Sequence, residues 1–351
     1  MTHPVARLWR RLPEPSTRAL RRLAIASLVS QAGIVVTGGA VRLTGSGLGC
    51  PTFPSCTEDS LVNTPEHGLH GYIEFGNRLL TFVLAAIALA TLLAVLRTLA
   101  GPRPRRDLLP LAVVLLLGIP AQAMIGGVTV LTRLDPWVVM LHFMCSAVLV
   151  GLATALVRRV SEPAVGPVRP FGSPWLRRLA TVVLGVAYAT VYAGTVVTGT
   201  GPHAGDPSSP RAGLDLEAVT HVHADLVFLL LGTTLGLWFA ARALGSPGRT
   251  SRAAGTLLAV ELAQGTIGYT QVFTGVPVLL VGLHMLGATL IVIAAVDAWL
   301  STRTFEGPTD QPTAPPARST LPVARTTVPP MTTSAGSVGR RPGADAGSRP
   351  H

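Results

Sequence analysis

Residues 121–150, AQAMIGGVTVLTRLDPWVVMLHFMCSAVLV, return in altered form at residues 263–292 as AQGTIGYTQVFTGVPVLLVGLHMLGATLIV. Three positions recur at one constant offset: Gln122, Gly126 and His142 correspond to Gln264, Gly268 and His284. Each copy contains two apolar segments joined by a short turn. Because roughly 20 apolar residues suffice to cross a bilayer, this stretch predicts a duplicated pair of membrane-spanning helices.

The duplication extends to the helices that precede each copy. Residues 31–47, QAGIVVTGGAVRLTGSG, return at residues 192–208 as YAGTVVTGTGPHAGDPS, and Asn77 in the following helix corresponds to His223. Four helices are therefore duplicated, and since four is even, both halves enter the membrane in the same sense. Parallel repeats of this kind are related by a pseudo-twofold axis along the membrane normal. We expect them to carry related sites, one in each half.

The composition agrees with an all-α polytopic membrane protein. Of 351 residues, 48% are hydrophobic and 13% are charged, which is typical of chains with several membrane spans. Eight spans are predicted, at 23–42, 72–96, 108–131, 137–157, 176–199, 220–241, 253–274 and 278–299. No cleavable signal peptide is evident before the first of them.

The basic residues predict the orientation of the spans. All 28 are Arg, and they cluster between alternate apolar segments, so by the positive-inside rule both termini are expected to be cytoplasmic. This clustering also argues against nucleic-acid binding, which the high charge would otherwise suggest. The predicted parts are an Arg-rich amino terminus (1–22), an amino-terminal half (23–157), a cytoplasmic linker (158–175), a carboxy-terminal half (176–300) and a disordered cytoplasmic tail (301–351).

Polar residues within the predicted spans are candidate functional residues, because each is costly in hydrocarbon. They are His70, Glu74, Asn77 and Arg78 in the second span, His142 in the fourth, His221, His223 and Asp225 in the sixth, and His284 in the eighth. Helical rise places Asn77, His142, His223 and His284 about 24–30 Å from the Arg residues that mark the cytoplasmic ends. These four therefore lie at one level, in the outer third of the membrane.

Two imidazoles on facing helices at matched depth can bind a heme iron from both sides. His223 and His284 form such a pair in the second half. In the first half His142 corresponds to His284, but Asn77 stands in the place of His223 and is a poor iron ligand. His70 lies two turns further out on the same helix face, with Glu74 between them. A lone membrane His is often only a hydrogen-bonding group between helices, but repetition favours ligation for His142 and His284.

Cys50 and Cys56 lie in GCPTFPSC, in the first loop on the side opposite the Arg clusters. A disulfide can persist in that oxidising compartment. The alternative, a metal site built on the two thiols, lacks partners of the right type. We therefore expect a disulfide.

In combination, VTGGAVRLTGSGLGCPTFPSC, IEFGNR and the paired LHFM and LHML helices resemble heme A synthase, the membrane enzyme family that converts heme O to heme A. The resemblance covers roughly residues 23–300. It implies oxidation of the C8 methyl group of heme O to a formyl group by successive hydroxylations. It further implies a heme b cofactor between His223 and His284, a substrate site at His142, and catalysis by Glu74.

One position departs from the family pattern, which reads Glu-x-x-His-Arg where this chain has Glu74-Phe75-Gly76-Asn77-Arg78. Either His70 supplies the second ligand of the substrate iron, or His142 binds it alone with Asn77 or water opposite, which we favour. Arg78 is expected to hold a heme propionate or to reach the membrane surface.

The resemblance also implies partners: heme O as substrate, membrane lipid, a heme O synthase and an electron-transfer partner, with homo-oligomerisation open and no nucleic acid. Two other classes fit parts of the pattern. A two-heme electron-transfer cytochrome would use the His residues but leave Glu74 idle. A transporter with parallel repeats would use the His residues as a proton relay and bind no heme.

Overall fold

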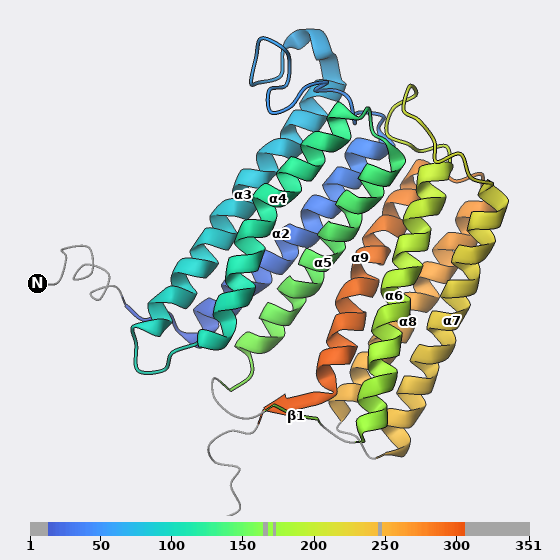
Figure 1. Ribbon diagram of the computed structural model, residues 1–351. Helices are drawn as coiled ribbons and strands as arrows, with labels where there is room; N and C mark the ends of the chain where they lie inside the picture. Colours follow the sequence, from blue (N-terminus) through green and yellow to red (C-terminus); the bar gives the residue numbers. More distant parts are fainter. Residues whose placement is uncertain (1–12, 164–167, 171–172, 245–247, 306–351) are drawn as a thin grey trace, which may run out of the picture. The chain divides into compact units, whose positions relative to one another are not determined.

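The computed structural model describes residues 13–163, 168–170, 173–244 and 248–305, and within them the chain forms eight long helices (Figure 1). These are α2 (Thr17–Leu43), α3 (Gly68–Leu99), α4 (Leu109–Leu131), α5 (Pro136–Val160), α6 (Pro174–Thr200), α7 (Leu216–Ala243), α8 (Gly248–Phe273) and α9 (Val278–Ser301). Two single-turn 3-10 helices, η1 (Pro65–His67) and η2 (Arg106–Leu108), precede α3 and α4. The eight predicted helices are confirmed, and most of them extend beyond their predicted ends.

Local sequence explains where several helices begin. The Asp135 carboxylate accepts hydrogen bonds from the second and third backbone N–H groups of α5, and Asp215 accepts one at the start of α7. Ser173 caps α6 in the same way, with Pro174 as its first residue. These side chains pair backbone donors that a helix leaves without partners, so the helix starts are specified locally.

Seven of the described helices are long and apolar enough to cross a membrane, and the chain is a polytopic membrane protein. The exception is α8, which is as long as the others but carries Arg252, Glu261 and Gln264 along its length. It packs against α7 and α9 as a full member of the bundle. Its lower hydropathy therefore reflects these polar residues, of which Glu261 is buried, and not a different place in the fold.

The helices form two groups of four with the same order of neighbours (Figure 1). In the first half α2 contacts α3, α3 contacts α4, α4 contacts α5, and α5 returns to α2; in the second half α6, α7, α8 and α9 repeat this ring. Burial repeats as well, since Leu84, Ala88, Thr91 and Val95 are buried in α3 and Leu230, Thr234, Leu237 and Ala241 in α7. The direction of a symmetry axis relative to a membrane stays a prediction.

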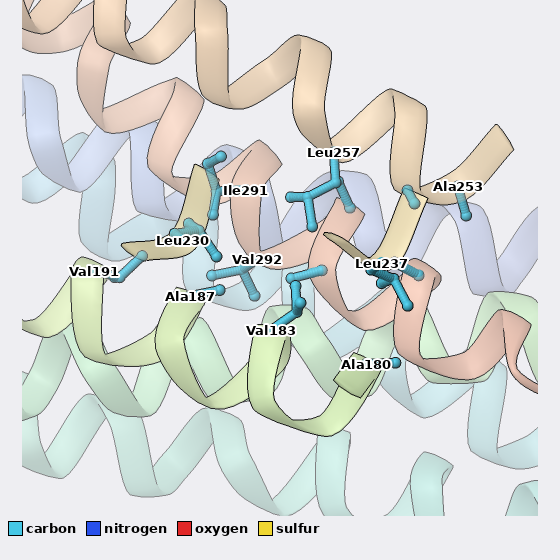
Figure 2. Close-up of a cluster of buried hydrophobic side chains, with 14 of the residues drawn as sticks. Ala180, Val183, Ala187, Val191, Leu230, Leu237, Ala253, Leu257, Ile291 and Val292 are labelled. Carbon is cyan, nitrogen blue, oxygen red and sulfur yellow. The ribbon is translucent and has the colours of Figure 1, made fainter. Parts of the chain in front are cut away.

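Small side chains bring the helices of the second half close together. Figure 2 shows Ala180, Val183, Ala187 and Val191 along one face of α6, directed toward Leu230, Leu237, Leu257 and Val292 of the surrounding helices. Ala180 and Ala187 are almost fully buried. Because helices in a membrane associate through close van der Waals packing, this cluster fixes the frame around the site described below.

Short strands occur beside the helix ends. In the predicted linker 158–175, β1 (Val168–Pro170) pairs antiparallel with β2 (Arg303–Phe305). β2 occupies part of the segment 301–351 that was predicted to be disordered, and the remainder of that segment, from residue 306, lies outside the described residues. At the other end α2 begins at Thr17, within the predicted segment 1–22, of which residues 1–12 also lie outside the described part.

Candidate functional site

One large cavity, of about 2380 Å³, is bordered by both halves of the bundle. Its lining includes most of the predicted site residues: Glu74, Asn77, Arg78 and His142 from the first half and His221, His223, Asp225 and His284 from the second. Pockets for small molecules usually measure about 300–1,000 Å³. The cavity is therefore large enough for more than one bulky ligand, with the candidate ligand residues of both halves on its wall.

His223 and His284 face each other across the second half. Their ring centroids are 6.5 Å apart and the ring planes are nearly perpendicular. A metal midway between them would lie about 3.3 Å from each centroid, half of that separation. This matches a metal–nitrogen bond of about 2 Å added to the distance from ring centre to ring nitrogen, so the pair fits one metal ion.

The Nδ1 atom of His223 lies 3.1 Å from the carbonyl oxygen of Thr190. A ligand His commonly donates its second ring N–H to a backbone carbonyl, which fixes the tautomer and leaves the other nitrogen free to bind metal. Thr190 thus holds the His223 ring in an orientation that leaves Nε2 available.

Each candidate ligand ring lies over a glycine of the preceding helix. A Cβ added at Gly126 would lie 3.3 Å from Cε1 of His142, one at Gly194 3.1 Å from Cε1 of His223, and one at Gly268 3.4 Å from Cε1 of His284. A larger residue at any of the three would press on the imidazole. The glycines therefore make room for the rings.

The repeated glutamines have the same role in both halves. Gln122 Nε2 donates to the backbone carbonyl of His142 at 3.1 Å, and Gln264 Nε2 donates to that of His284 at 2.9 Å. The Nδ1 atoms of His142 and His284 are buried and make no hydrogen bond with other protein groups. Buried polar atoms without partners call for an explanation, and a ligand in the cavity is consistent with them.

Within the described residues, no cluster of three or more His, Cys, Asp and Glu side chains could hold a metal ion directly. An ion between His223 and His284 would therefore need its other ligands from a bound group. A porphyrin supplies four nitrogens in a plane and leaves the two axial positions to the protein. The residues present fit a heme with two axial imidazoles in the second half.

The first half differs at the position opposite His142. Asn77 lies on the cavity wall, where its Oδ1 accepts a hydrogen bond of 2.7 Å from Thr37. His70 is exposed, and its Nδ1 lies 2.8 Å from the Ser46 hydroxyl, away from the cavity lining. The structure therefore brings Asn77 to the site and leaves His70 at its periphery.

Glu74 and Arg78 are held together by the loop that follows α2. Glu74 is only 6% exposed; its Oε2 accepts from the backbone N–H of Cys50 at 2.7 Å and its Oε1 from Arg78 at 2.6 Å. Arg78 also donates to the backbone carbonyls of Cys50, Thr52 and Ser55. The carboxylate is thus fixed at the edge of the cavity, and the guanidinium is engaged by the loop.

The predicted disulfide between Cys50 and Cys56 is confirmed, and it closes this loop. Gly49 lets the loop lie on α3, because a Cβ there would collide with the backbone carbonyl oxygen of His70. Phe53 lies against α4 at Gly127, where a Cβ would contact its ring, and it borders the cavity. The closed loop therefore forms one wall of the first-half site.

Comparison with protein families agrees with these features. The family model described as cytochrome oxidase assembly protein, COX15-CtaA, matches residues 21–296. The chain belongs to this family, the heme A synthase family. A comparison with curated proteins gives no match. Its general role is thus in heme A synthesis for the assembly of cytochrome oxidase.

The cavity is also bordered by a buried carboxyl group that was not among the residues predicted from the sequence. Glu261 of α8 borders the cavity and is 5% exposed; its Oε1 accepts a 2.7 Å hydrogen bond from Thr234 of α7. A signal was present in the sequence, because Glu261 is an acidic residue near the middle of the predicted span 253–274.

Proposed function

We propose that this member of the heme A synthase family oxidises the C8 methyl group of heme O to a formyl group by successive hydroxylations. One observation carries the proposal. A single cavity joins a half with two facing imidazoles to a half with one imidazole and a buried carboxylate. The first arrangement suits a permanent cofactor, and the second suits a substrate heme with an acid–base group beside it.

Glu74 is the proposed proton acceptor. Oxidation of a methyl group releases protons, and a carboxylate beside the reacting carbon can receive them. The N–H of Cys50 and the guanidinium of Arg78 hold the carboxylate in one orientation, which is the positioning that such a step requires. Arg78 is a candidate for binding a propionate, but its contacts with three loop carbonyls favour a role in positioning Glu74 and the loop.

His142 is the proposed protein ligand of the substrate iron. Asn77 lies on the wall of the same half and is not expected to bind iron strongly, so the substrate iron keeps a weakly held or water-filled position. This differs from the second half, where His223 and His284 would hold heme b on both faces. Bound there, heme b supplies one-electron transfer.

The proposed enzyme works in a membrane and depends on other proteins for its substrate and its electron transfer. We place it in the cell membrane with both termini cytoplasmic, on the distribution of its Arg residues. Heme O would come from a heme O synthase, and the electrons would pass to or from a separate electron-transfer partner. Homo-oligomerisation stays open.

The decisive experiment supplies heme O to the purified protein and separates the extracted hemes by chromatography. A heme bearing a formyl group is the expected product. Retention of a heme spectrum with no such product would instead indicate an electron-transfer cytochrome, and a colourless protein would indicate a transporter. A heme-loaded Glu74→Gln sample serves as the matched inactive control.

A further inference from the structure

Glu261 is a buried acid for which the proposed reaction has no use. Thr234 donates to its Oε1, while its Oε2 is buried and has no hydrogen-bond partner in the protein. No ion pair among the described residues includes it. Ionisable residues at membrane depth are costly and commonly functional, and Glu261 is one of the residues that border the cavity.

The position of Glu261 relates it to the cofactor half. Gln264 and Gly268 follow it at intervals of three and seven residues, which places all three on one face of α8. Gln264 donates to the His284 carbonyl, and Gly268 lies against the His284 ring. Glu261 is therefore about 10 Å along α8 from the level of that ring.

The duplicated half provides a comparison for this pair. At the repeat offsets, Ile119 corresponds to Glu261 and Ala88 to Thr234. Ile119 and Ala88 are buried together in an apolar cluster between α3 and α4. Since an apolar pair packs this helix contact in the first half, packing alone does not require a carboxyl and a hydroxyl in the second.

We propose that Glu261 is a redox-linked proton acceptor of the cofactor half. If heme b were held by His223 and His284 and reduced by one electron from a donor, the Glu261 carboxylate would take up one proton and become a carboxylic acid. Oxidation releases the electron and the proton together. The net charge of the enclosed site then stays constant, which avoids the cost of an uncompensated charge in a medium of low polarity. This proposal rests on the proposed function for the presence of heme b.

The cavity offers a route for the proton. It extends from Glu261 to the start of α7, where Glu217, Thr220 and His221 border it. These residues lie at the end of the bundle that carries the α6–α7 loop. In this proposal the proton moves between that end and Glu261 along the cavity.

The helices packed against α8, and α8 itself, carry further titratable and charged residues. Within the described residues, Thr234 is the one residue of α7 that forms a hydrogen bond with Glu261. The others on these elements, at other levels, are Glu217, His221, His223, Asp225 and Arg242 on α7, His284 and Asp297 on α9, and Arg249, Arg252 and Tyr269 on α8 itself. Glu261 is the one acidic residue of α8 (Gly248–Phe273) and lies near its middle, so we assign the proton to it.

The test is a potentiometric titration of the heme b spectrum in the purified holoprotein at a series of pH values. In the wild type we expect the midpoint potential to fall as the pH rises, because reduction takes up a proton. Glu261→Gln should lose this dependence. The double variant Thr234→Ala/Glu261→Ile recreates the buried pair of the first half, so it should fold, bind heme b and also lose the dependence.

Asp59→Asn, which removes an exposed carboxyl group from the first loop, is the control and should keep the wild-type slope. Redox-difference infrared spectra should show a carboxylic acid band that disappears in both Glu261 variants. If the midpoint potential of either Glu261 variant depends on pH as in the wild type, the proposal is wrong, even when the protein converts heme O. A third result is possible: the wild-type protein fails to convert heme O, yet its midpoint potential depends on pH and this dependence is lost in the Glu261 variants. That result overturns the proposed reaction and retains the role of Glu261.

Discussion

Glu74 has two different donors on its two oxygens, a backbone N–H of the disulfide loop and the Arg78 guanidinium. Glu74→Gln keeps the size of the side chain and an oxygen that can accept from Cys50, but it cannot accept a proton near neutral pH. We expect heme O conversion to fall by about 10²–10⁴-fold, the usual contribution of general acid–base catalysis. The heme b spectrum should not change.

Glu66→Gln is the control for this prediction, because Glu66 is an exposed acid in η1, shortly before α3. It should convert heme O at the wild-type rate, measured by chromatography of extracted hemes under the same conditions. Undiminished conversion by Glu74→Gln would remove Glu74 from the mechanism.

Asn77 occupies the position at which the second half has the candidate ligand His223. It lies on α3, across the helix ring from His142 on α5, as His223 on α7 lies across from His284 on α9. Asn77→His should therefore add a second axial imidazole in the first half. We expect heme O bound to this variant to show a six-coordinate low-spin spectrum and slower conversion. The same substitution combined with His142→Ala should show no such spectrum; if it does, the new ligand pairs with another residue.

At the scale of helices, the glycine contacts decide how closely neighbours approach the ligand rings. Gly194→Val places a branched side chain where even a Cβ would lie 3.1 Å from His223. Overpacking costs about 1–3 kcal/mol, so we expect heme b to bind on the order of 10- to 100-fold more weakly. Gly185→Val on the same helix is the control, because a Cβ there meets nothing within 4 Å. Equal heme content in the two purified variants would contradict the prediction.

The helices and the paired His residues could be predicted because they follow from apolar run length and from a constant repeat offset. The partners of Arg78 could not, since they are carbonyl groups of an irregular loop whose path depends on long-range contacts such as Gly49 on α3. Glu261 could have been noticed in the sequence, as an acid within a predicted span. Its burial and its hydrogen bond with Thr234 could not, because they depend on how α7 packs against α8.

At the scale of the molecule, Arg42 joins the two halves. It belongs to α2, yet its Nε donates to the carbonyl of His203 at 2.6 Å and its Nη2 to that of Thr198 at 3.0 Å, both in the second half. Arg42→Ala leaves these acceptors without a charged donor, which costs about 1–3 kcal/mol. We expect a lower melting temperature in detergent. Arg133→Ala, which truncates an exposed Arg in the α4–α5 turn, should melt like the wild type; equal melting of both variants would show that Arg42 does not hold the halves together.

The proposed heme sites of the two halves border one cavity. His142 lies on α5 of the first half and His284 on α9 of the second, so each should control one heme alone. His284→Ala should abolish the low-spin heme b spectrum while added heme O still binds. His142→Ala should keep that spectrum and lose binding of heme O. Both variants can be followed by absorbance spectra and by heme extraction from the same sample. Loss of both hemes in either variant would mean that the halves bind heme cooperatively across the cavity, and an unaltered spectrum in His284→Ala would place heme b elsewhere.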